Sequence, residues 1–151
     1  MLAAFPVSKT TLNYLATVTR NVHVLVVAED WCGDVHRQVP ILEAVARTSP
    51  KLHVRYITRM DRPDVFVRFL TNGGEAIPKF IFLSDNFVEC GNWGPMPDVC
   101  RRIIARGKAA GDVASARKKT AALFDADPAG EETVRELLAL IDITVAAKSE
   151  G

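Results

Sequence analysis

The sequence predicts an α/β fold in which a central mixed sheet of about four strands is flanked by helices. Four short apolar stretches, bounded by Gly, Pro, Asn and Ser, have the length and composition of strands. Stretches with apolar residues at helical spacing surround them. The first two strands enclose one such helix, so we expect them to be parallel with a right-handed crossover. The last two are separated by a short turn and should form an antiparallel hairpin.

The first half of the chain supplies three helices and two strands. Ser8 is predicted to cap a helix that runs through Val18. Residues 22–28 are almost continuously apolar, which predicts a strand covered on both faces, and a helix through Ala46 follows. Residues 52–57 alternate in polarity, which predicts a strand with one more exposed face. A short helix over 61–70, with a proline in its first turn, ends this half.

The second half is predicted as a hairpin followed by helices. A strand over 79–83 leads through a turn at 84–86 into a strand over 87–90. Residues 91–97 are rich in Gly and Pro and predict a loop, after which a helix starts near Asp98.

The chain from residue 111 is rich in Ala and charged residues and predicts two more helices, over 113–125 and 133–147. Asp127 and Pro128 should supply the cap and the first-turn proline of the last one. We therefore divide the chain into an α/β domain over 1–110 and an extension over 111–151, a helical hairpin packed on the same domain. The same helices can alternatively form a homodimer or partner surface.

Composition excludes several classes of protein. The 151 residues are 48% hydrophobic and 25% charged with a net charge of +1, as is ordinary for a globular protein. Nucleic-acid binding is disfavoured, because the sequence has no dense basic run interleaved with aromatic residues. No stretch has the roughly 20 apolar residues of a membrane span, and the N-terminus lacks the pattern of a secretory signal. Three cysteines are an odd count without a dense framework, so we expect a reducing, cytoplasmic location.

The most informative motif is Trp31-Cys32-Gly33-Asp34-Val35, at a predicted strand-to-helix junction. Backbone N–H groups and the helix dipole favour a thiolate at such a place, so Cys32 is the candidate nucleophile. Asp34 acts in both directions, since a nearby anion disfavours a thiolate but suits the helix dipole. Sequence alone does not give the sign of its net effect.

The motif and three further features resemble the thioredoxin-like family. They are Pro40 eight residues after the cysteine, Ile77-Pro78 before a strand, and the later Trp93-Gly94-Pro95. The resemblance covers roughly residues 20–108. With Asn72-Gly73-Gly74, it points to a bacterial branch that also tends to carry C-terminal helices.

The resemblance implies a site around Cys32. Cys32 would be the attacking thiol, and Pro78 would be cis and face it. Trp31, Gly33, Asp34 and Ile77 would contribute to substrate binding, with Ile77 offering its backbone to an extended chain.

Three departures from the family narrow the predicted chemistry. Val35 stands where the resolving cysteine is expected, so the active-site motif is a degenerate Cys-Gly-Asp-Val. Val26 stands where the family has a buried acid. The lysine that the family pairs with this acid has no clear counterpart here, since Arg55 and Arg59 are only nearby.

Two functions follow. The first is a monothiol disulfide exchanger in which an external thiol such as glutathione resolves the bond that Cys32 makes with protein disulfides or small thiols. The alternative is a catalytically degenerate binding module that holds a peptide or protein on a surface of Trp31, Ile77 and Trp93. A peroxide-reacting thiol is disfavoured because Glu29, not Thr or Ser, lies three residues before the cysteine.

No cofactor or metal is expected. His36 lies one helical turn after Cys32, but without a Cys-x-x-Cys pair a metal half-site with Cys90 or Cys100 is disfavoured. Cys90 and Cys100 are expected to be buried free thiols.

Overall fold

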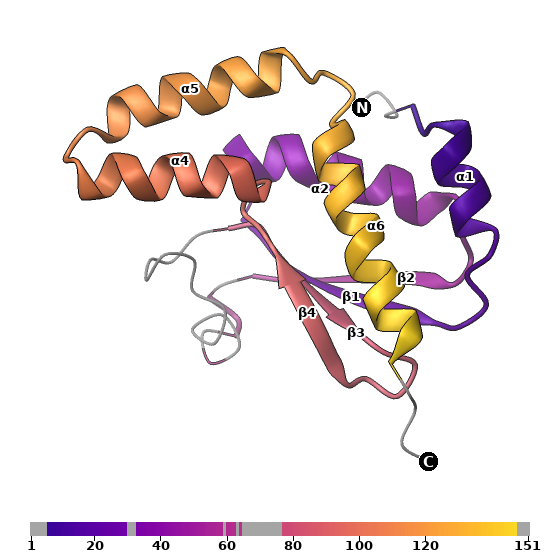
Figure 1. The fold of residues 1–151 in the computed structure, drawn as a ribbon. Coiled ribbons are helices and arrows are strands. Elements are labelled where there is room, and N and C mark those ends of the chain that lie inside the picture. The colour runs from indigo at the N-terminus through magenta and orange to yellow at the C-terminus, as the bar shows by residue number, and fades with distance from the viewer. Residues whose placement is uncertain (1–5, 30–32, 59, 63, 65–76, 148–151) are drawn as a thin grey trace.

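The computed structural model describes residues 6–29, 33–58, 60–62, 64 and 77–147. Within them the predicted α/β fold is confirmed, with helices packed around one four-stranded mixed sheet (Figure 1). The helix predicted over 61–70 lies almost wholly outside the described residues, as do Trp31, Cys32, Arg59 and the Asn72-Gly73-Gly74 stretch. No helix in the described part of the chain is long and apolar enough to cross a bilayer.

The sheet has the strand order β2-β1-β3-β4. β1 pairs in parallel with β2 and antiparallel with β3. β3 pairs antiparallel with β4, so the predicted parallel pair and the predicted hairpin are both present. The strands are β1 (Val22–Val27), β2 (Leu52–Ile57), β3 (Lys79–Leu83) and β4 (Glu89–Trp93).

The helices mostly start and end close to the predicted residues. Ser8 caps the first of them, since its hydroxyl accepts a hydrogen bond from the Thr11 backbone N–H at 3.1 Å. The helices with described bounds are α1 (Lys9–Leu15), α2 (Gly33–Arg47), α4 (Asp98–Ala109), α5 (Val113–Asp125) and α6 (Glu131–Ala146).

The predicted start of β4 is wrong. The apolar character of Phe87 and Val88 predicts a strand, but both residues lie between the turn and the strand and are 65% and 56% exposed. Ser84 organises this turn, because its side chain accepts from the Val88 backbone N–H and its carbonyl accepts from the Phe87 N–H. The strand therefore begins at Glu89 and extends to Trp93, through residues predicted as loop.

The two C-terminal helices do not form a hairpin with each other. α5 pairs with α4, whereas α6 crosses the sheet and contacts β4, β3, β1 and α2 (Figure 1). The α4–α5 pair approaches closely at Gly107, where an added Cβ would lie 2.5 Å from the Ala116 Cβ. The predicted cap of α6 is wrong by three residues: the N-cap is Gly130, and the helix begins at Glu131, so Pro128 precedes its first turn. The Asp127 carboxylate still accepts the backbone N–H groups of Glu131 and Glu132.

The main hydrophobic core lies between the sheet and helices α1, α2 and α6. Phe80 and Phe82 of β3 are fully buried, and α6 adds Leu137 and Ile141 at 0% and 1% exposure. The division of the chain at residue 110 stays a prediction, but the α6 part of the predicted extension contributes directly to this core.

Candidate functional site

The site predicted from the sequence centres on the first turn of α2. Gly33 is the first residue of this helix and is exposed, with no atom within 4 Å of the position its Cβ would take. Cys32 therefore immediately precedes a 15-residue helix in the chain, although Cys32 and Trp31 lie outside the described residues. Backbone N–H groups at such a helix start favour an anion.

Val35, an aliphatic residue, occupies the position where the family has its resolving cysteine. It is 9% exposed and belongs to an apolar cluster with Val27, Ile77 and Ile81. The structure thus brings together two predicted site residues, Val35 of α2 and Ile77 of the segment just before β3. Among the described residues, the members of this cluster are all aliphatic, so none of them supplies a thiol or an acid.

The Ile77–Pro78 peptide bond is cis, as the resemblance implies, and both residues are buried. A second cis bond, Gly94–Pro95, follows β4. Gly94 has a φ of 126°, and a Cβ on it would lie 2.1 Å from the Pro78 carbonyl oxygen. The loop after β4 therefore lies directly on Pro78, a contact that the Gly-Pro dipeptide alone did not reveal.

Lys79 is a residue that sequence reasoning missed. It is only 3% exposed, and its Nζ donates a hydrogen bond to the Gly94 carbonyl oxygen at 2.8 Å. Burial, with a smaller contribution from Arg101, lowers the pKa of the Lys79 ammonium to about 8. The available signal was a lysine directly after Ile-Pro in an otherwise apolar strand.

Asp34 lies half-buried in the first turn of α2. Burial raises the pKa of its carboxyl group, and the positive charges of Arg117 and Arg37 oppose this shift. Arg117 belongs to α5, so a helix of the predicted extension contributes a charge that acts on the site.

Two other residues discussed for the site, Trp93 and Val26, lie in the hydrophobic core and away from the first turn of α2. Trp93 is 2% exposed, stacks on Phe80 at 5.1 Å and donates its indole N–H to Glu136 at 2.8 Å. The predicted binding surface of Trp31, Ile77 and Trp93 is therefore wrong for Trp93, because its ring is enclosed by the core. Val26 is also fully buried in the core.

The other cysteines and the histidine form no second centre in the part of the chain that the structure describes. Cys100 is buried and Cys90 half-buried, and both are free thiols. Burial is the main cause that raises the pKa of the Cys100 thiol to about 11. His36 is exposed, and no group of three metal-ligating side chains occurs among the described residues.

A family model described as thioredoxin matches residues 1–114. The chain belongs to the thioredoxin family. This confirms the resemblance at the level of the family and agrees with the sheet order and with the placement of Pro78. No curated protein matches the chain.

Three solved structures share the thioredoxin-like fold. A protein of unknown function from Pseudomonas aeruginosa is 20% identical, with a TM-score of 0.66, and the match covers 91% of this chain and 75% of that one. An HIV epitope scaffold is 22% identical, with a TM-score of 0.67 and coverages of 94% and 76%. An alkylhydroperoxide reductase component from Enterococcus faecalis, a cysteine-to-alanine mutant, is 18% identical, with a TM-score of 0.50 and coverages of 60% and 43%. At these identities the similarity concerns the fold alone.

Proposed function

We propose that this thioredoxin-family protein exchanges disulfides through one nucleophilic thiol, Cys32, and depends on an external thiol to complete the cycle. The observation that carries the proposal is the apolar burial of Val35 against Ile77 at the position where the family places its resolving cysteine. We assign the chain to a branch of the family with the degenerate motif Cys-Gly-Asp-Val.

The proposed reaction has two exchanges. The Cys32 thiolate attacks one sulfur of a substrate disulfide, a bond forms between Cys32 and that sulfur, and the second substrate sulfur leaves as a thiolate that takes up a proton. An external thiolate such as glutathione then attacks the substrate sulfur of the mixed disulfide. This releases the Cys32 thiolate and a new disulfide, so no net oxidant or reductant beyond the two substrates is consumed.

Neither remaining cysteine is suited to replace the external thiol. Cys100 is 2% exposed, and its raised pKa keeps it protonated at neutral pH, whereas the attacking species in exchange is a thiolate. Cys90 lies in β4, with its thiol directed to the Val88 carbonyl oxygen at 3.3 Å.

The test is the exchange of a small disulfide with glutathione as the reductant, using three variants. Cys32→Ser should lose the activity, and the matched control Cys90→Ser should keep it. Val35→Cys restores the two-cysteine spacing and should yield, on oxidation, an internal disulfide between Cys32 and the introduced thiol. If Cys32→Ser were as active as the wild type, the proposal would be wrong. The alternative, a binding module in which Cys32 has no chemical role, would then be favoured.

A further inference from the structure

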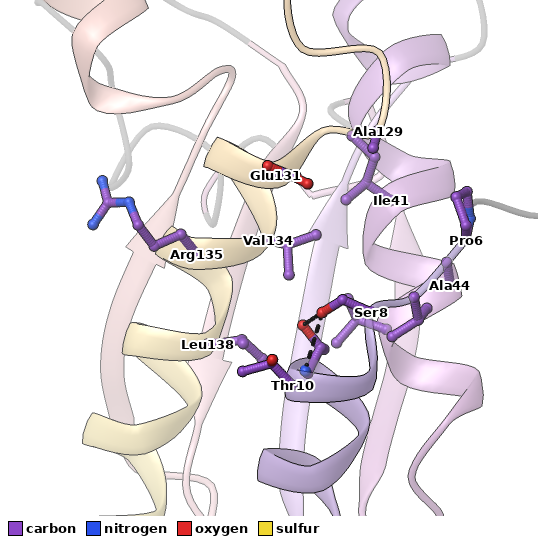
Figure 2. A pocket seen from close by; sticks show the side chains of 13 residues that line it. Pro6, Ser8, Thr10, Ile41, Ala44, Ala129, Glu131, Val134, Arg135 and Leu138 are labelled. Atoms are coloured by element: carbon purple, nitrogen blue, oxygen red, sulfur yellow. Dashed lines mark hydrogen bonds between the residues drawn. The ribbon is translucent and has the colours of Figure 1, made fainter.

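A cavity of about 410 Å³ lies between α1, α2 and α6, away from the first turn of α2 (Figure 2). Its volume is within the range of small-molecule sites. Its floor is apolar, and Figure 2 shows Val134 and Leu138 of α6 on one side, with Ile41 and Ala44 of α2 across from them. We propose that this cavity binds an amphipathic small molecule with an apolar body and a cationic amine head.

The donors that α6 could offer to an anionic head are already used. The Asp127 carboxylate accepts the backbone N–H groups of Glu131 and Glu132 at 2.9 and 3.0 Å, so these N–H groups at the start of α6 are occupied. The Arg135 guanidinium is paired with Glu132 and lies 3.8 Å from Glu136, and Figure 2 shows it pointing away from the cavity. A carboxylate ligand would have to displace these partners.

The charge left for a ligand is the Glu131 carboxylate. It lines the cavity, beside Ile41 and Ala129 in Figure 2, and within the described residues its side chain has no hydrogen-bond or ion-pair partner. An ammonium group there would gain a charge-assisted hydrogen bond without displacing a protein group. The apolar floor would bury the rest of the ligand.

The experiment compares three probes with the same chain and different heads: octylammonium, octanol and octanoate. Binding is followed by NMR chemical-shift changes of the Thr11, Val45 and Val134 amides in the full chain. The proposal expects octylammonium to bind more tightly than octanol, and octanol more tightly than octanoate. Raising the salt concentration should weaken octylammonium binding but not octanol binding, because the head interaction is exposed and screened.

Two variants and a control assign the site. Glu131→Gln should weaken octylammonium by about fivefold, near the upper end for a solvent-exposed ion pair, and leave octanol unchanged. Thr10→Trp, at an exposed position on the cavity wall, should abolish binding of all three probes without touching the core. Glu89→Gln on β4, outside the cavity, should change nothing.

Other outcomes overturn the proposal. Equal affinities of the three probes would show an apolar cleft without selection for the head, and a preference for octanoate would show an anion site. Absence of shifts at the three amides, or binding that survives Thr10→Trp, would show that this cavity is not the site.

Discussion

Lys79 gives a prediction whose size follows from the structure. The residue follows cis-Pro78, is 3% exposed, and donates one Nζ hydrogen bond to the Gly94 carbonyl oxygen. Its pKa falls from the ordinary 10.5 to about 8, mainly because burial disfavours the charged form. Holding this ammonium in the fold therefore costs stability, and Lys79→Met should remove the cost.

The difference between 10.5 and about 8 in pKa, at 1.36 kcal/mol for each pKa unit, corresponds to about 3 kcal/mol. Below pH 8 both states carry the proton, so the full cost is present. Between about pH 8 and pH 10.5 the unfolded chain binds more protons than the folded one, so this group makes the protein more stable as the pH rises. Above that range the cost is gone.

The assay is urea unfolding of the wild type and of Lys79→Met at several pH values from 7 to about 10.5. The free energy of unfolding of the wild type should rise relative to the variant by about 3 kcal/mol over the upper part of this range. Taking the difference cancels other groups, such as Cys100, whose raised pKa acts in the opposite direction. Parallel curves for the two proteins would refute the burial argument for Lys79.

Substitutions at three further positions test contacts of the fold and of the site. Gly94→Ala should lower the free energy of unfolding by about 3 kcal/mol or more, because φ of Gly94 is 126° and the added Cβ would meet the Pro78 carbonyl oxygen. A decrease under about 1 kcal/mol in urea unfolding would contradict this. Glu136→Ala should cost about 3 kcal/mol by leaving the buried Trp93 indole N–H and the start of α4 unpaired, and Glu136→Gln should cost clearly less. Asp34→Asn should lower the pKa of the Cys32 thiol, measured by alkylation, because it removes a negative charge two residues away in the chain; an increase would be evidence against that electrostatic effect.

Local signals were enough for most of the fold. The strand at 22–27 and the helix from Gly33 are recognisable because their apolar spacing is a property of the segment itself. The start of β4 at Glu89 could not be recognised in this way, because the hydrogen bond from the Val88 N–H to the Ser84 side chain determines where the strand begins. The pairing of α5 with α4 was also missed, since periodicity shows that a helix has an apolar face but not which element covers it.

The candidate site divides in the same way. The replacement at Val35 could be seen directly in the sequence, and its consequence, an apolar contact with Ile77, was added by the structure. The burial of Lys79 and the action of Arg117 on Asp34 could not be predicted, because each depends on segments far apart in the chain. These long-range effects are the ones that set charge and protonation near the site.

The pKa of Cys32 tests the proposed chemistry most directly. It is measured from the pH dependence of the alkylation rate of Cys32 in a protein that carries Cys90→Ser and Cys100→Ser. A thiol at the start of α2 that attacks disulfides should titrate well below the ordinary value of about 8.5. A pKa at or above 8.5 would contradict the single-thiol mechanism and leave the binding module as the function of this fold.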